Sequence, residues 1–434
     1  HHPPIARSIG YVTAVAIVIA SMIGTGVFTT LGLQAEEMQT GFALLCLWAL
    51  GGLIAMTGAL SYGELAAAMP RSGGEYHFLG RIYHPVLGIV AGWISVTVGF
   101  AAPSALAAMA LGHYAAVFSN VSPMPVAVLT ILAVAAFHGF SVRIGKHFHL
   151  VTTAMKLVLI ATFCMAGLLA EPFDSASVAP SMQGWREVFS PSFAFSLIYV
   201  SYAYSGWNAA TYVASEVRNP QRILPAALLH GTLIVTILYV LLNYVFLSTV
   251  PVSRLSGRLD VGALSASYIF GPSGSVLANV SICVLLVSTI SAMVMAGPRV
   301  LQVAGEDLPG LHSLAVRTRA GSPLRAILLQ QMLALGFLVT DSFEDVLSYA
   351  GFTLNLIALL TVSGVFVLRY TKPDLPRPYR VPGYPLTPAV FVLMNIVILV
   401  SVLHSRPVAG VAGLLTILAG AALIVLHKRR TEHA

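Results

Sequence analysis

The chain has 434 residues, of which 57% are hydrophobic and only 9% are charged, and its mean hydropathy is +0.85. Soluble domains typically carry about 25% charged residues, so this composition excludes a soluble globular protein and makes lipid the solvent for much of the chain. The net charge of +7 does not indicate nucleic-acid binding, because the basic residues sit in short gaps between apolar runs, where they set membrane topology.

Apolar runs long enough to cross a bilayer, about 20 residues each, follow one another along the whole chain. They predict twelve helices, at residues 9–33, 41–69, 85–118, 125–140, 148–170, 189–215, 225–250, 272–303, 323–340, 344–370, 386–404 and 408–427. We therefore expect an all-α, multi-pass protein embedded in a lipid bilayer.

Lysine and arginine residues are concentrated in alternate connections between these spans. With the N-terminus inside, the inner segments carry most of the 23 basic residues, whereas the outer loops carry Arg186, Arg254, Arg258 and Arg406. Because cytoplasmic loops are enriched in Lys and Arg, this asymmetry predicts a cytoplasmic-membrane protein with both termini in the cytoplasm.

Two of the predicted spans are interrupted near their middle. Ser21-Met22-Ile23-Gly24-Thr25-Gly26 interrupts the first, and Tyr204-Ser205-Gly206-Trp207-Asn208 interrupts the sixth. Glycine is a poor helix former that lets a ligand approach the backbone, and breaks at corresponding positions of two halves indicate a transporter site. The two halves would be residues 5–170 and 187–370, each with five spans and of opposite topology, and residues 385–427 would add two spans. Close helix packing is the alternative explanation for either break alone.

Four local motifs occur in a fixed order along the chain. They are Gly24-Thr25-Gly26-Val27-Phe28; Tyr62-Gly63-Glu64-Leu65 followed by Pro70-Arg71-Ser72-Gly73-Gly74-Glu75-Tyr76; Tyr204-Ser205-Gly206-Trp207-Asn208 continuing to Glu216-Val217-Arg218-Asn219-Pro220; and Gly297-Pro298-Arg299-Val300. With these motifs the chain resembles the amino acid–polyamine–organocation (APC) superfamily over essentially its whole length, in particular bacterial amino acid permeases close to the L-type amino acid transporter group. The resemblance implies a leucine-transporter-like 5+5 inverted repeat with discontinuous first and sixth helices.

The resemblance also implies a sodium-independent secondary transporter that moves neutral L-amino acids by alternating access, with proton coupling and exchange both left open. Phe246 stands where L-type exchangers often have a tyrosine, so their exchange mechanism does not transfer directly. Cationic amino acid or polyamine exchange is one alternative, and a non-transporting nutrient receptor is another. The spans show no filter loop typical of a channel and no catalytic constellation typical of an enzyme, and we expect no cofactor or metal.

An amino acid zwitterion that leaves water needs a partner for each charge, and a helix break offers backbone groups for both. We expect the α-carboxylate to bind the N–H groups of Gly24, Thr25 and Gly26. We expect the α-ammonium to bind carbonyls around Ile23, Tyr202, Ala203 and Ser205. The resemblance implies the same division.

The resemblance places an aromatic lid over the substrate at Tyr202, one helical turn before the break in the sixth span. Packing within the helix bundle is the alternative role for this ring. The pocket for the substrate side chain is predicted to draw on Trp207, Thr289, Ser291 and Met293.

Lys156 is the one basic residue expected deep within a span, where charges are rare and by default functional. The resemblance implies that this lysine replaces the sodium ion of sodium-coupled relatives, reaches the first break and the eighth span, and in some members takes up and releases a proton. A structural lysine that only ties the fifth span to the first is the alternative. Both interpretations predict sodium independence.

None of the 16 Asp and Glu residues is expected at the centre of a span, which favours neutral over cationic substrates. At the cytoplasmic side, an inner gate closed by ion pairs is predicted from Glu64, Arg71, Glu75, Glu216 and Arg218. Ordinary helix-end charge is the alternative.

All three cysteines, Cys46, Cys164 and Cys283, lie within apolar runs. The connection around Ser119 and Asn120 contains no cysteine. A disulfide-linked heavy chain, which animal members of the resembled family have, is therefore not expected.

Overall fold

The structure is a computed structural model that describes residues 7, 9–117, 121–140, 142–170, 178–307, 312–316, 318 and 323–432. Across these residues the regular elements are helices, apart from one isolated bridge between Ile9 and Val217. The predicted all-α class is confirmed. The described residues do not include Ser119 and Asn120. They also leave out Arg317 and Arg319, two of the basic residues predicted on the inner side, and the first positions of the predicted 5–170 half.

The chain forms a long series of helices. Up to residue 170 they are α1 (Tyr11–Met22), α2 (Gly26–Glu37), α3 (Gly41–Ala68), α4 (Glu75–Ile82), α5 (Pro85–Ile94), the π-helix η1 (Ser95–Phe100), α6 (Ala101–Ala116), α7 (Pro123–Phe140) and α8 (Val142–Leu169). After it they are α9 (Met182–Val188), α10 (Pro191–Ala203), the 3₁₀-helix η3 (Ala209–Glu216), α11 (Pro220–Thr249), α12 (Val252–Leu255), α13 (Val261–Asp307), α14 (His312–Ala315), α15 (Leu324–Leu338), α16 (Phe343–Thr371), α17 (Leu386–Ser405) and α18 (Pro407–Glu432).

By length and apolar composition, 6 helices of the described chain can each cross a membrane. They are α3, α5 to α6 taken together, α11, the part of α13 up to Pro298, α16 and α17. The pair α1 and α2, bent by 40° between Met22 and Gly26, makes up to 7. Shorter apolar helices lie within α7, α8, α15 and α18. The chain is thus a multi-pass membrane protein, as its composition predicted.

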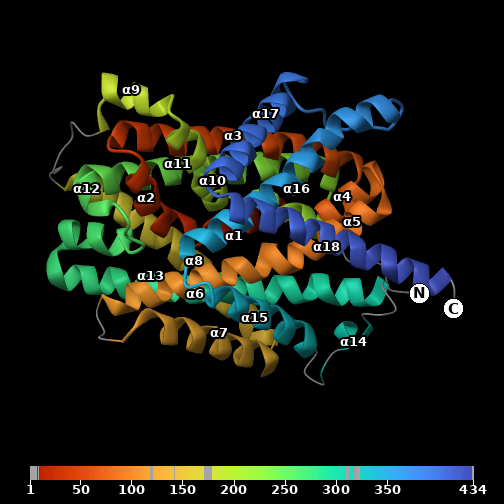
Figure 1. Cartoon of the computed structure of the whole chain (residues 1–434), viewed down its shortest axis with the longest axis horizontal. Coiled ribbons are helices and arrows are strands. Elements are labelled where there is room, and N and C mark those ends of the chain that lie inside the picture. Colours follow the sequence, from red (N-terminus) through yellow and green to blue (C-terminus); the bar gives the residue numbers. More distant parts are fainter. Residues whose placement is uncertain are drawn as a thin grey trace.

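The long helices run roughly in one common direction, which is horizontal in Figure 1. α9 and α12 lie at one end of the bundle, and α4 and α14 lie at the other end. α1 is near the middle of the bundle, between α3 and α11 on one side and α6 and α13 on the other (Figure 1). The segment that the sequence marks as broken is therefore surrounded by other helices.

Several elements differ from the predicted spans. The short helices α4, α9, α12 and α14 are too short to produce an apolar run, and the sequence did not predict them. The eighth span was expected from residue 272, but helix already begins at Val261 and turns at Gly271, whose φ is 68°. Only glycine adopts this left-handed conformation at little cost, which lets the chain reverse just before Pro272.

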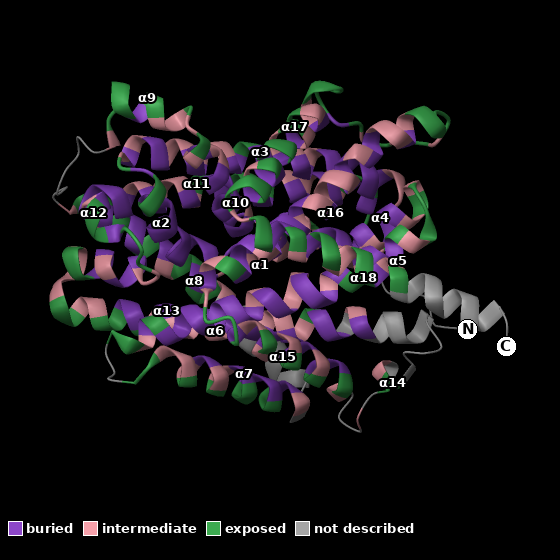
Figure 2. Ribbon diagram, viewed as in Figure 1, coloured by how far each residue is buried: buried purple, intermediate pink, exposed green. Residues whose placement is uncertain are grey.

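The core is continuous and rich in aromatic rings and small residues, as the buried residues at the centre of Figure 2 show. Large apolar side chains are also exposed on the outer helices, for example Leu129 on α7, Leu393 on α17 and Leu418 on α18. In water such exposure would be unfavourable, whereas in a bilayer these side chains contact lipid.

Candidate functional site

The first span is broken as predicted. α1 ends at Met22, and Ile23 to Thr25 are not helical before α2 begins at Gly26. The break frees carbonyl groups from intrahelical bonding. The hydroxyl of Tyr239 on α11 donates to the carbonyl oxygen of Met22 at 2.6 Å, so the end of α1 is held by a side chain from another helix.

The sixth span is also broken. α10 ends at Ala203, a series of turns covers residues 204–208, and the chain continues as the 3₁₀-helix η3. Gly206 has φ 96°, which disfavours any other residue. A Cβ atom at Gly206 would lie 2.7 Å from the carbonyl oxygen of Ser21, and one at Gly26 would lie 2.5 Å from the Cα of Ala203. The two breaks therefore touch each other through backbone, which only glycine permits.

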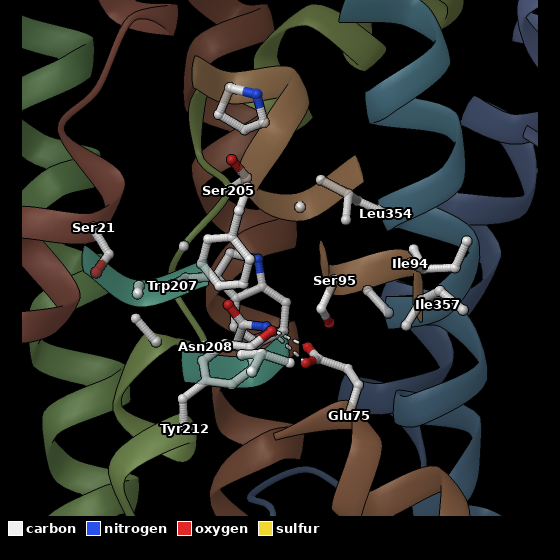
Figure 3. Close-up of a pocket in the computed structure, with 18 of the residues that line it drawn as sticks. Ser21, Glu75, Ile94, Ser95, Ser205, Trp207, Asn208, Tyr212, Leu354 and Ile357 are labelled. Carbon is white, nitrogen blue, oxygen red and sulfur yellow. Dashed lines mark hydrogen bonds between the residues drawn. The ribbon is translucent and has the colours of Figure 1, made fainter. Parts of the chain in front are cut away.

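Both breaks form the wall of a cavity of about 1760 Å³. Nine of the eleven predicted substrate-binding residues line it: Gly24, Thr25, Gly26, Tyr202, Ala203, Ser205, Trp207, Thr289 and Met293. The lining continues to the exposed residues Arg71, His84 and Pro85, so the cavity opens at the end of the bundle where α4 lies. Figure 3 shows Trp207, Ser205 and Asn208 of the sixth-span break around this space.

The hydroxyl of Thr25 is a polar group without a partner at the first break. Thr25 lines the cavity, is only 3% exposed, and its Oγ1 makes no hydrogen bond in the structure. Buried polar groups are normally hydrogen-bonded, and an orphan hydroxyl costs stability. An unpaired hydroxyl at the start of α2, where N–H groups also point outward, suits an anionic ligand group.

Two predicted binding residues, Ser291 and Ile23, do not line the cavity. The Ser291 hydroxyl lies 2.7 Å from Nε2 of His138 on α7. The helical period explains this, because Thr289 and Met293 are four residues apart on one face of α13, whereas Ser291 points to another face. The Ile23 side chain is buried in the core, and its carbonyl oxygen is the polar group at the break.

Lys156 on α8 is 2% exposed and reaches the first break. Its Nζ donates to the Ile23 carbonyl at 2.9 Å and to Oγ1 of Thr289 at 3.2 Å. The Thr289 hydroxyl in turn donates to the Leu285 carbonyl at 3.0 Å. One ammonium thus joins α8, the break and α13, the contacts that the family resemblance implies. Among the described ion pairs none includes this lysine.

The charged residues predicted for an inner gate do not pair with one another in the described structure. Glu64 is 1% exposed and binds Arg369 at 2.6 Å and Arg377 at 3.5 Å, both far along the chain. It also accepts from the backbone N–H of Val381 at 2.7 Å. Arg71, another residue of the predicted gate, is exposed at the cavity mouth instead.

Glu216 and Arg218 are exposed, and their backbone contacts the start of the chain. The Ile9 N–H donates to the Glu216 carbonyl at 3.0 Å, and the Arg218 N–H donates to the Ile9 carbonyl at 2.9 Å. The two residues therefore anchor the segment before α1 to the end of η3. Their side chains form none of the ion pairs of the described residues.

His77 on α4 lies in the cavity wall outside the spans, and its pKa is lowered from 6.5 to about 4. Burial is the main cause, and the positive charges of Arg71 and Arg81 add to it. His77 is consequently neutral over the physiological pH range.

The sequence analysis missed three polar residues of the site. Tyr239 holds the end of α1, and Asn208 and Tyr212 donate to the carboxylate of Glu75 (Figure 3). Glu75 and Asn208 were inside recognised motifs, but their sequence separation hides their contact. Glu75, which the sequence analysis placed only in the inner gate, lines the same cavity as the breaks from the start of α4.

Comparison of the sequence with known proteins finds amino acid transporters. The sequence model of the amino acid permease family matches residues 9–425. The b(0,+)-type amino acid transporter 1 of Mus musculus is 26% identical over 413 residues, which cover 92% of this chain and 83% of the relative. The large neutral amino acids transporter small subunit 2 of Mus musculus is 26% identical over 427 residues, which cover 95% of this chain and 80% of the relative.

Proposed function

Because the chain belongs to the amino acid permease family, we propose that it is a sodium-independent carrier of neutral L-amino acids that works by alternating access. The observation that carries the proposal is the contact of two helix breaks at the wall of one large cavity, with an unpartnered hydroxyl at one of them. Such breaks expose both hydrogen-bond donors and acceptors within a membrane.

The two breaks can bind the two ends of a zwitterion. The α-carboxylate would bind the N–H groups of Gly24 to Gly26 and the free hydroxyl of Thr25, at the positive end of the α2 dipole. The carbonyls of Met22 and Ile23 already accept from Tyr239 and Lys156. The Tyr202 carbonyl likewise accepts from the Ser205 N–H at 2.9 Å, so the α-ammonium is expected mainly at the carbonyls of Ala203 and Ser205, at the sixth-span break.

The cavity opens at one end of the bundle, and packed aromatic rings support closure toward the other end. Trp48, Tyr204 and Tyr239 pack with ring centroids 5.1–6.0 Å apart, and the Tyr204 hydroxyl donates to the Trp48 carbonyl at 3.1 Å. Tyr202, the proposed lid, is buried beside the break. This arrangement suits a carrier open to one side only, and we assign that side to the cytoplasm, with both termini there.

Within this proposal, the chain has twelve spans arranged as two inverted halves, residues 5–170 and 187–370, with residues 385–427 added. The positions of the breaks support it, since each lies in the first span of its half: between α1 and α2, and between α10 and η3. The pairing of two broken spans is the feature that an inverted repeat produces.

Sodium independence follows from the position of Lys156. Its ammonium donates to the Ile23 carbonyl and the Thr289 hydroxyl, which are oxygen atoms of the kind that hard cations bind. A fixed positive charge there also disfavours a second cation nearby. The uptake experiment described below distinguishes proton coupling from amino acid exchange.

Neutral substrates are favoured because Glu75, the acidic residue among the cavity-lining residues, already accepts hydrogen bonds from Tyr62, Asn208 and Tyr212. A cationic amino acid or polyamine exchanger would need a carboxylate that is free to bind a second amine. One of the two Mus musculus relatives is named a large neutral amino acids transporter small subunit, which agrees with this preference.

We propose that the carrier needs no disulfide-linked partner, although that relative is named as a small subunit. Cys46 lies in α3, Cys164 in α8 and Cys283 in α13, all free and within membrane helices. A thiol within a span is poorly placed for a disulfide to a subunit outside the membrane.

The test is uptake of each standard amino acid into proteoliposomes, with sodium present or replaced and with or without a pH gradient. Sodium-independent counterflow of neutral amino acids is expected. Uptake driven by a pH gradient and lost in Lys156→Ala, but not in the exposed control Lys372→Ala, would establish proton coupling. Uptake that is indifferent to the gradient and requires amino acid inside the vesicles would establish exchange. Binding without flux would identify a receptor, and a sodium requirement would contradict the role of Lys156.

A further inference from the structure

A network of three side chains ties α10 to two other parts of the bundle. The Tyr199 hydroxyl on α10 donates to Oε1 of Glu344, in the first turn of α16. Nη2 of Arg406, between α17 and α18, donates to the same oxygen at 2.5 Å. Tyr199 is completely buried, whereas the other two side chains are partly exposed. Tyr199, Glu344 and Arg406 together form what we call the Glu344 clasp.

The clasp lies on the side of the bundle away from the cavity mouth. α10 follows directly after α9, and α9 is at the end of the bundle opposite α4 (Figure 1). None of the three residues of the clasp lines the cavity, whereas Ser201 and Tyr202, further along α10, do. The clasp is therefore beyond the cavity, toward its closed end.

The helix that the clasp holds carries part of the proposed binding site. α10 ends at Ala203 in the sixth-span break, where it meets the first break at Gly26. It also packs tightly on α16, because a Cβ atom at Gly351 would lie 3.0 Å from the Ile198 side chain. Both helices border the cavity, so a path to it between them requires that α10 and α16 separate. This separation breaks the bond between Tyr199 and Glu344.

Two buried hydroxyl groups act against this closure. Ser196 on α10 and Ser348 on α16 are 0% exposed, and neither Oγ atom makes a hydrogen bond in the structure. Residues three or four apart share a helix face, so Ser196 lies on the face of Tyr199 and Ser348 on the face of Glu344. Water that enters between the helices can bond both hydroxyls, which favours opening. The clasp offsets this tendency.

We propose that the Glu344 clasp latches the closed side of the carrier. It holds α10 against α16, and loss of its bonds lets the two helices separate, which opens the cavity toward the α9 end. The place of this step in a transport cycle rests on the proposed function, whereas the separation of α10 from α16 can be measured without any transport.

The test measures how fast a buried cysteine reacts with a hydrophilic maleimide at one fixed pH. Ser196→Cys changes the side chain little and reports opening between α10 and α16. Ala214→Cys is also buried but lies on η3, in the other half of the broken sixth span, and reports general loosening. Both are made in purified full-length protein in lipid nanodiscs, without substrate, with Cys46, Cys164 and Cys283 changed to Ser. Rate ratios between variants then report the opening equilibrium.

Tyr199→Phe should label about ten-fold faster than the parent at Ser196→Cys, because it removes one hydrogen bond to a charged group. Arg406→Gln should give a smaller increase of about three-fold, since its ion pair is partly exposed and screened by water. Asp345→Asn is the matched control: this neighbouring carboxylate is exposed and 3.9 Å from Arg406, so the rate should stay within about two-fold. All three variants should leave Ala214→Cys at the parent rate.

A cycle with Glu344→Ala shows whether Tyr199 acts through this carboxylate, since Tyr199→Phe should add no further increase in that background. An unchanged rate in Tyr199→Phe, or an equal rise at Ser196→Cys and Ala214→Cys, would overturn the proposal. If Tyr199→Phe does not fold, Arg406→Gln decides by the same comparison of the two reporters. Failure of amino acid uptake with these rate ratios intact would refute the proposed function and leave the clasp standing.

Discussion

Gly206→Ala tests whether contact of the two breaks creates the binding site. A Cβ atom at this position would lie 2.7 Å from the Ser21 carbonyl oxygen and 3.2 Å from the Met22 nitrogen, whereas ordinary contacts are 3.4–4 Å. These neighbours are backbone, so they cannot rotate away, and the breaks must separate by about 0.7 Å. The φ of 96° adds a strain of about 1–3 kcal/mol for a residue with a side chain.

The expected consequence is a loss of both stability and affinity. A zwitterion that spans both breaks would lose or lengthen at least one charge-assisted hydrogen bond, worth about 1.5–3 kcal/mol, which corresponds to a roughly 10- to 100-fold higher Kd. Equilibrium binding of radiolabelled amino acid to the purified, monodisperse protein measures Kd, and thermal unfolding of the same sample measures Tm.

Gly336→Ala is the matched control, since a Cβ atom there meets nothing within 4 Å. Gly336 lies in α15, where alanine is the better helix former, so Kd should stay within about two-fold and Tm should not fall. If Gly206→Ala binds amino acids as tightly as the parent, the zwitterion does not bridge the two breaks, and the reasoning from their contact is refuted.

Three further changes, with a control substitution for one of them, test separate parts of the structure. Thr25→Val should raise the Kd for neutral amino acids about ten-fold without lowering Tm, because the hydroxyl it removes has no partner in the empty protein. Glu64→Gln should destabilise the protein by about 3–5 kcal/mol, because it leaves Arg377 buried without its counter-charge. Asp260→Asn, which breaks an ion pair with a half-exposed arginine, should cost at most about 1 kcal/mol. His77→Gln should leave the pH profile of uptake above about pH 5.5 unchanged, because the pKa of His77 is about 4.

The sign of the His77 effect on stability follows from its lowered pKa. As the pH falls from 6.5 toward about 4, the unfolded chain binds a proton that the folded protein does not, so stability declines over this interval. The decline in Tm should be smaller in His77→Gln. An equal decline in both proteins would contradict the assigned burial of His77, and a Glu64→Gln protein as stable as Asp260→Asn would contradict the buried network around Glu64.

Local features of the sequence were sufficient for the membrane class, the positions of both breaks and the buried lysine. The apolar runs follow from the lipid that surrounds each span. Gly24, Gly26 and Gly206 follow from the backbone conformations that are possible at these positions. The period of a helix could also have separated Thr289 and Met293 from Ser291, since two of these residues share one face and the third does not.

The tertiary structure alone decided which polar groups meet. Glu64 is paired with Arg369, 305 residues away, and Glu75 with Asn208, 133 residues away. The sequence analysis had instead grouped both acids with Arg71 and Arg218 in one ion-paired gate. Solvent and backbone preference act on each segment separately and leave a pattern along the chain. The pairing of distant side chains depends on which helix faces pack together, and that is determined by the whole fold.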